Sequence, residues 1–184
     1  MLLRMINDVN KALDVEAYMA ALALVLTIPD VCAKAEYPMQ QNKKRYIAWY
    51  DEYIGQYEKA PCEPDEEQMP YLSGEVVYQL RCSVLHQGTP NIDKRKIQDI
   101  DEFVLLTESK KPFDIYGDMV EVIGERRIYQ ANLRGLCNII CWCAEAYYKN
   151  NKEKFDFFNY KIVDIDKEFP YLRENSIWQD CERG

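Results

Sequence analysis

The hydrophobic positions of this chain recur at helical spacing over most of its length. Residues 17–28 are apolar apart from Thr27, and Asp14 is a suitable N-cap, so the pattern predicts a buried helix over 15–28. This run of twelve residues is too short to cross a bilayer. A long helix is also expected over 129–150, with one apolar stripe made of Leu133, Leu136, Ile140, Ala144 and Tyr147.

Another helix is predicted over 42–59, where tyrosines recur at helical spacing. They stand at i, i+4, i+7 and i+11, as Tyr46, Tyr50, Tyr53 and Tyr57. This stripe could form a stacking platform for bases, but we interpret it as the core face of an amphipathic helix. The proline-rich, acidic stretch over 60–72 is expected to be a loop.

The next predicted helix has recognisable ends, because Ser73 is a suitable N-cap and Gly88 fits a left-handed C-terminal position. Farther on, "EFVLLTE" and "DMVEVIGERRI" are rich in β-branched residues and lack the helical period. We therefore expect an antiparallel β-hairpin, or a small sheet, over about 102–128, inserted into a helical bundle. The predicted architecture is mainly α, a single domain over 1–184, with a tail over 151–184 that packs on the bundle.

The charge and the cysteine content limit which ligands and partners the protein is expected to bind. The chain has 23 basic and 31 acidic residues, a net charge of −8, so a nucleic acid would have to bind at a local basic site. No basic leader followed by an apolar stretch and a cleavage site is visible at the N-terminus, and we expect a soluble cytoplasmic protein that does not bind membranes. Seven cysteines without a CxxC spacing suggest reduced thiols, and neither a metal nor another cofactor is expected.

The stretch "VVYQLRCSVLHQG" carries the strongest sign of chemistry, since it contains Arg81 and the only histidine, His86. On a helical wheel the apolar arc is about 200° wide and includes the position of Arg81. A guanidinium there must be paired, or lie at the border with a second contact surface. Asp51 or Glu52 could be its partner. The alternative is that a subunit interface lies on this helix, which we call the motif helix.

That interface would involve Tyr78 and Leu85. His86 lies about 140° from Arg81 around the helix and about 7.5 Å farther along it, so one straight helix does not readily bring the two together. A second copy across a two-fold axis would do so. The alternative is that His86 only caps the helix C-terminus, while Arg81 forms a buried ion pair.

The segment "RCSVLH", Arg81 to His86, resembles the signature of the HEPN superfamily, in which four to six residues separate an arginine from a histidine near the end of a bundle helix. The resemblance covers the helical part of residues 1–150. Many HEPN proteins are metal-independent endoribonucleases of toxin–antitoxin and other defence systems, and commonly act as dimers with two motifs in one cleft. Others are inactive RNA-binding or assembly modules. Cys82 stands where members usually have a polar residue, often asparagine.

The resemblance implies an RNA-cleaving site with two catalytic side chains. His86 would transfer the proton and Arg81 would stabilise the charge on the phosphate, giving a 2′,3′-cyclic phosphate and a 5′-hydroxyl. Ser83 and Gln87 are candidate substrate-binding residues. Two functions stay open: a HEPN-type ribonuclease, with an RNA substrate and an antitoxin as partners, and a non-catalytic module that dimerises through the motif helix.

Overall fold

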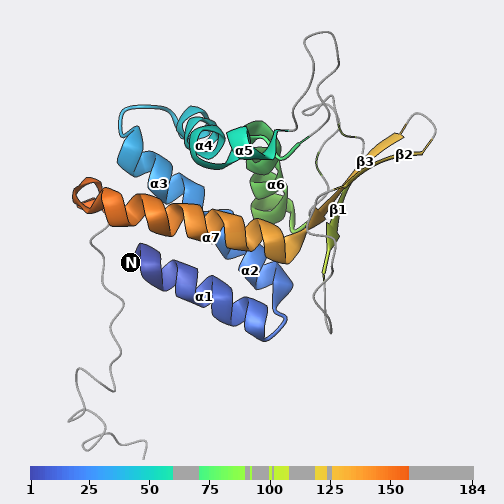
Figure 1. Cartoon of the computed structure of the whole chain (residues 1–184), viewed down its shortest axis with the longest axis horizontal. Coiled ribbons are helices and arrows are strands. Elements are labelled where there is room, and N and C mark those ends of the chain that lie inside the picture. Colours follow the sequence, from blue (N-terminus) through green and yellow to red (C-terminus); the bar gives the residue numbers. More distant parts are fainter. Residues whose placement is uncertain are drawn as a thin grey trace, which may run out of the picture.

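In the computed structural model the chain is mainly helical, with one small sheet at one end of the helices (Figure 1). The structure describes residues 1–59, 71–89, 92, 100, 102–107, 119–123 and 126–157. The α-helices are α1 (Leu2–Asp14), α2 (Tyr18–Val25), α3 (Ile28–Glu36), α4 (Asn42–Tyr50), α5 (Gln56–Glu58), α6 (Gly74–Gln87) and α7 (Leu133–Asn150). The strands are β1 (Glu102–Leu106), β2 (Met119–Ile123) and β3 (Arg126–Asn132), and a 3₁₀ turn, Lys152–Phe155, follows α7.

The N-terminal third differs from the prediction, since the expected helix over 15–28 is divided. Asp14 is the last residue of α1 rather than an N-cap, and the chain turns at Glu16, whose φ is +58°. α2 begins at Tyr18, and the hydroxyl of Thr27 donates to the carbonyl of Leu24 where α2 ends. Pro29 then lies in the first turn of α3, where its missing N–H is no loss.

The predicted helix over 42–59 is confirmed as a continuous helical segment. α4 runs into a π-helical stretch, Asp51–Gly55, and then into the short α5. The tyrosine stripe is a core face only in its first half: Tyr46 and Tyr50 are buried, whereas Tyr57 is 78% exposed. Tyr53 is half-buried and stacks on the ring of Trp49, with 5.2 Å between centroids.

α4 and α6 approach each other closely at a glycine. A Cβ on Gly74 would lie 2.7 Å from the carbonyl oxygen of Ile47, so only glycine allows this backbone contact. Asp51 accepts a hydrogen bond of 2.6 Å from the backbone N–H of Gly74. The predicted ends of α6 are confirmed, because the Ser73 hydroxyl accepts from the N–H of Val76 at 3.4 Å and Gly88 is left-handed with φ +67°.

The sheet has the strand order β1-β3-β2. β3 is antiparallel to β2 but parallel to β1, with Phe103 opposite Tyr129 in the register, and their rings are stacked 5.7 Å apart. The prediction of a small sheet in this region is therefore confirmed, but an antiparallel hairpin joining the two β-rich runs is wrong, because β3 lies between β1 and β2. α7 also begins four residues later than predicted, after β3, where Asn132 caps it by accepting from the N–H of Gly135 at 2.9 Å.

α7 lies against α1, α2 and α3, and its predicted apolar stripe is buried (Figure 1). The predicted tail falls mostly outside the described residues, but Phe155 in its first turn is buried against Tyr147 and Tyr148. By length and composition, Tyr18–Glu36 could cross a membrane. Half of that segment is buried inside the protein, as the core helix of a soluble protein would be, so this is a weak indication. That the bundle is of HEPN type, and that it is one domain, stay predictions.

Candidate functional site on helix α6

One side of α6 faces the core and the other forms a surface strip. Apart from Gly74 in the first turn, the buried residues occupy about 160° to 320° of a wheel on which Arg81 is the origin: Val76, Val77, Gln79, Leu80, Ser83 and Val84. Apart from Gln87 at the C-terminal end, the partly or fully exposed ones lie from about 0° to 140°: Glu75, Tyr78, Arg81, Cys82, Leu85 and His86. We call these six residues the α6 strip. Arg81 therefore lies at one edge of the strip and His86 at the other, rather than Arg81 lying inside a buried arc.

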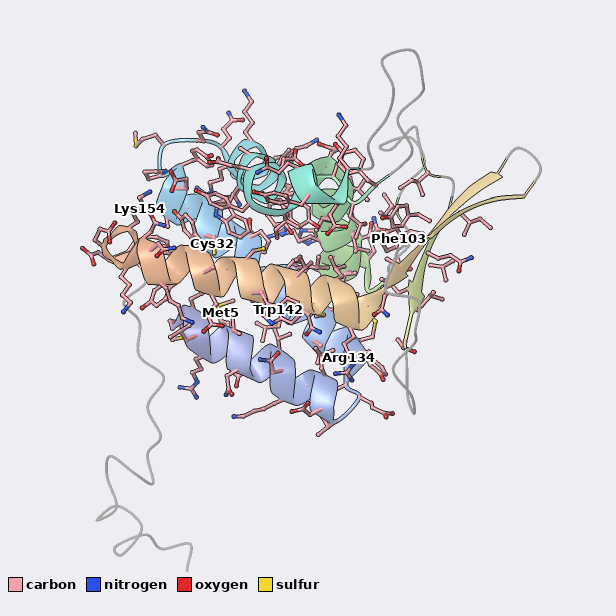
Figure 2. All side chains as sticks on the ribbon, viewed as in Figure 1. Met5, Cys32, Phe103, Arg134, Trp142 and Lys154 are labelled. Atoms are coloured by element: carbon pink, nitrogen blue, oxygen red, sulfur yellow. The ribbon has the colours of Figure 1, made fainter. Side chains whose placement is uncertain are left out.

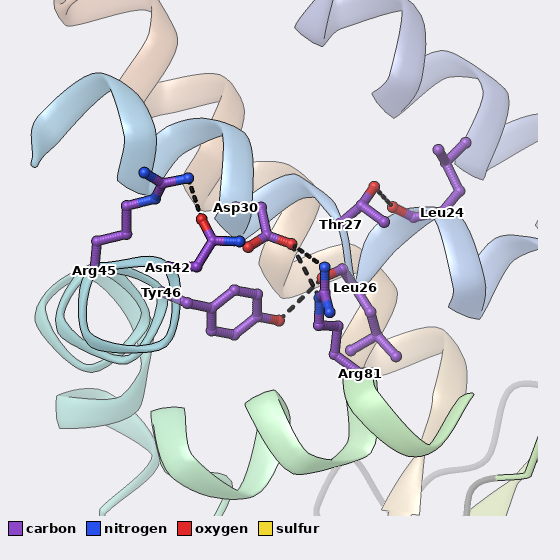
Figure 3. A network of polar contacts seen from close by, with 8 residues as sticks. All are labelled: Leu24, Leu26, Thr27, Asp30, Asn42, Arg45, Tyr46 and Arg81. Carbon is purple, nitrogen blue, oxygen red and sulfur yellow. Dashed lines mark hydrogen bonds and ion pairs between the residues drawn. The ribbon is translucent and has the colours of Figure 1, made fainter. Parts of the chain in front are cut away.

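Arg81 forms an ion pair with Asp30 of α3 (Figure 3). Its Nε and Nη2 atoms both lie 3.0 Å from Oδ2 of Asp30, and each side chain is 18% exposed. The prediction that Arg81 must be paired is confirmed, but the predicted partners are wrong. Asp51 is engaged with the N–H of Gly74, and Glu52 accepts from the hydroxyl of Tyr37.

The sequence also carried a signal for Asp30 that went unused. Asp30 lies between Pro29 and Val31 in an apolar segment, which is the same anomaly that singled out Arg81. Two opposite charges in otherwise apolar helices are expected to pair, because a lone buried charge is costly.

Burial changes the pKa values of both members of this pair. It raises the pKa of Asp30 from its ordinary value, an effect that the positive charge of Arg81 and its hydrogen bond only partly offset. Burial lowers the pKa of Arg81, but Asp30 and, to a smaller extent, Cys82 raise it, and the net direction is upward. Arg81 therefore stays charged, and the carboxylate of Asp30 is the member of the pair whose charged form is disfavoured by burial.

The ion pair lies within a larger polar group between α3, α4 and α6 (Figure 3). The hydroxyl of the buried Tyr46 donates to the carbonyl of Leu26 at 3.1 Å, and its ring meets that of Tyr78 edge to face at 5.3 Å. On the same side of α4, the guanidinium of Arg45 donates to the side chain of Asn42. Within the described residues, Oδ1 of Asp30 and Nε of Arg45 are buried without a hydrogen-bond partner.

His86 is an exposed residue in the last turn of α6. A cation is favoured there by the partial negative charge of the helix C-terminus. Within the described part of the chain no hydrogen bond or ion pair joins His86 to Arg81, as the separation of about 7.5 Å along the axis leads one to expect. A single copy of the chain thus presents the two residues on one surface without bringing them into contact.

The predicted substrate-binding residues lie in different surroundings. Gln87 is the last residue of α6 and is exposed. Ser83 is only 6% exposed and faces the core, so its hydroxyl does not reach the surface strip. The substrate-binding roles of both residues stay predictions.

Among the described residues, no cluster of three or more His, Cys, Asp or Glu side chains could hold a metal ion. Burial raises the pKa of the Cys137 and Cys141 thiols to about 12, so these two neighbours on α7 carry protons at neutral pH. Neither thiol is therefore a ready metal ligand or nucleophile.

The chain matches no family model, no curated protein and no solved structure. What the site does must therefore be argued from its own residues.

Proposed function

We propose that this protein is a HEPN-like, metal-independent endoribonuclease of the cytoplasm. The observation that supports this best is that Arg81 and His86 border one surface strip of α6, with Arg81 held in place by Asp30. A catalytic arginine needs a fixed position and free N–H groups. Asp30 binds Nε and Nη2 and so fixes the guanidinium, whose other N–H groups would have to contact the phosphate.

The chemistry requires only these two side chains, since RNA supplies its own nucleophile. The 2′-hydroxyl attacks the adjacent phosphorus, the bond to the 5′-oxygen breaks, and a 2′,3′-cyclic phosphate and a 5′-hydroxyl result. The imidazole of His86 would transfer the proton, and the Arg81 cation would stabilise charge on the phosphate oxygens.

A homodimer would gather two Arg81 and two His86 side chains around one α6–α6 contact. If two α6 helices pack antiparallel about a two-fold axis, a register that sets Cys82 beside Leu85 of the second copy also sets Arg81 level with the second copy's His86. The strip offers Tyr78, Cys82 and Leu85 between the two polar edges, and such a surface suits a helix–helix contact. Leu85 is 36% exposed in the single chain.

A second candidate function is a non-catalytic, dimerising HEPN-like module that binds RNA or a protein. The observation in its favour is the Asp30–Arg81 pair itself, because a largely buried ion pair between two helices also serves as a structural tie. The acidic net charge of −8 is in its favour as well. A role as a toxin or defence effector, with an antitoxin as partner, belongs to the first candidate alone.

The experiment that separates the two uses purified protein, single-stranded RNA and an excess of EDTA. The endoribonuclease predicts cleavage that EDTA does not suppress, and products that end in cyclic phosphates. Light scattering on the same sample should give about twice the chain mass of 21.7 kDa. A dimer without cleavage of a varied RNA pool would favour the module, and a strict monomer would remove the shared cleft.

A further inference from the structure

The segment of residues 34–45 is strongly basic for this chain. It contains four basic residues and one acidic residue, whereas the other 172 residues carry 19 basic and 30 acidic ones. The basic residues are Lys34, Lys43, Lys44 and Arg45. The last three lie in the first turns of α4, and the side chains of Lys43 and Lys44 are exposed. A nucleic acid could bind this acidic protein only at such a local site.

This basic turn of α4 adjoins the α6 strip. Nζ of Lys43 and Cζ of Arg81 lie at the same distance, 5.9 Å, from the ring centroid of Tyr78. Arg45 acts electrostatically on Asp30, the partner of Arg81. Lys43 of α4 and Arg81 of the motif therefore flank the same ring. Together with Lys44 and Arg45, which follow Lys43 in α4, they make up what we call the α4–α6 basic surface (Lys43, Lys44, Arg45, Tyr78 and Arg81).

In the part of the chain that the structure describes, Lys43 pairs with one carboxylate, that of Glu75. Glu75 accepts from Lys43 at 2.8 Å and from Gln79 at 2.8 Å, and the two charged side chains are 50% and 38% exposed. Exposed pairs of this kind stabilise a fold by about 0–1 kcal/mol and exchange readily for another anion. Within the described residues no ion pair is formed by Lys44.

We propose that the α4–α6 basic surface binds the backbone of single-stranded RNA and leads it to Arg81. This inference rests on the proposed function and names the docking site for its substrate. Phosphates would contact Lys43 and Lys44 without regard to base sequence. In the dimer register given above, the second copy's α6 ends level with Leu80, so Glu75 and the neighbouring Lys43 stay open to the strand.

The test measures binding apart from cleavage. The His86→Ala protein and a fluorescently labelled single-stranded RNA of about 20 nucleotides are titrated at several salt concentrations, with anisotropy as the readout. Lys43→Ala/Lys44→Ala in this background should bind about tenfold more weakly at 0.2 M salt, and the slope of log K against log salt should fall by about 1.4, the loss of two phosphate contacts. Glu75→Gln should tighten binding, because it frees Lys43.

The chain offers a matched control. Lys149 is paired with Glu145 and Lys152 is exposed, so Lys149→Ala/Lys152→Ala removes the same charge from an equivalent pair of lysines elsewhere. The proposal predicts no change of slope in this control and full recovery in Lys43→Arg/Lys44→Arg. Equal weakening by both double variants, or none by Lys43→Ala/Lys44→Ala, would overturn it.

These outcomes are separate from those of the proposed function. RNA binding that depends on Lys43 and Lys44, in a protein that cleaves nothing, would uphold the surface and reject the catalysis. Cleavage with an unchanged kcat/KM in Lys43→Ala/Lys44→Ala would reject the surface alone. Binding of acidic proteins but not of RNA would also reject it.

Discussion

Asp30 and Arg81 join α3 to α6 through a single carboxylate oxygen, which accepts from two N–H groups of the guanidinium at 3.0 Å each. The pair spans 51 positions of the chain. It fixes α6 on the bundle at the point where the helix presents Arg81 to the surface, so the structural tie and the candidate catalytic residue are one side chain.

This pair predicts strongly coupled stability effects. Asp30→Ala and Arg81→Met should each lower the free energy of unfolding by about 2–4 kcal/mol, since each leaves a largely buried charge without its partner. The double variant should lose much less than the sum, with a coupling energy of about 1–3 kcal/mol. Urea unfolding of the four proteins measures this cycle. Additive losses would mean that the ion pair has no role of its own.

The π-helical segment predicts a glycine requirement. A Cβ on Gly55 would lie 2.6 Å from Oδ1 of Asp51, the atom that accepts from the N–H of Gly74. Gly55→Ala should therefore cost about 1–3 kcal/mol. Gly135→Ala is the matched control: its Cβ would meet only Asn132, at an ordinary 3.5 Å, and it should raise the stability by up to about 1 kcal/mol. Thermal unfolding distinguishes the two, and equal effects would contradict the crowding at Asp51.

The turn between α1 and α2 predicts a stabilising substitution. Glu16 has φ +58°, a left-handed conformation that costs an L-residue with a side chain about 1–2 kcal/mol. Glu16→Gly should relieve part of that strain and raise the free energy of unfolding by about 0.5–1 kcal/mol. Val15→Gly, at the neighbouring φ of −100°, should destabilise the protein instead. If both substitutions lower the melting temperature, the turn is not strained as described.

The end of α7 predicts a pH dependence. Oε2 of Glu36 accepts from Lys154 at 2.6 Å and from the hydroxyl of Tyr147 at 2.5 Å, and these hydrogen bonds lower the pKa of Glu36 below its usual 4.5. A carboxylate with a lowered pKa stabilises the fold above about pH 4.5, and this contribution is lost as the pH falls through the folded-state pKa.

Glu36→Gln should therefore cost about 1 kcal/mol at pH 7, and this cost should shrink as the pH falls below about 4.5. Chemical denaturation of both proteins across this pH range gives the difference directly. A cost that does not change with pH would show that shape, rather than charge, determines the role of Glu36.

Local patterns predicted the helices well where their ends carry clear signals. Ser73 and Gly88 defined α6, and the apolar stripe of α7 defined its buried face. The break between α1 and α2 was missed because neither glycine nor proline stands there, and Glu16 adopts a conformation that its side chain does not favour. The strand pairing was predicted wrongly because a hairpin joins strands that are close in sequence. The parallel contact of β1 with β3 depends instead on the tertiary fold.

The candidate site was predicted in its residues but not in its geometry. The position of Arg81 in an apolar helix showed that it needed a partner, yet nothing local to α6 distinguishes Asp30 from Asp51 or Glu52. That choice depends on which helices pack together, a tertiary property. The edge positions of Arg81 and His86 likewise follow from which side of α6 the bundle buries.

The most direct test of the central proposal compares His86→Ala, at the end of α6, with Asn10→Ala on α1, outside the candidate site. Both residues are exposed, so neither change should move the melting temperature by more than about 2 °C. In EDTA, the wild type and Asn10→Ala should cleave single-stranded RNA to cyclic phosphate ends, and His86→Ala should lose at least about 100-fold in rate. Cleavage by His86→Ala at the wild-type rate would contradict the account.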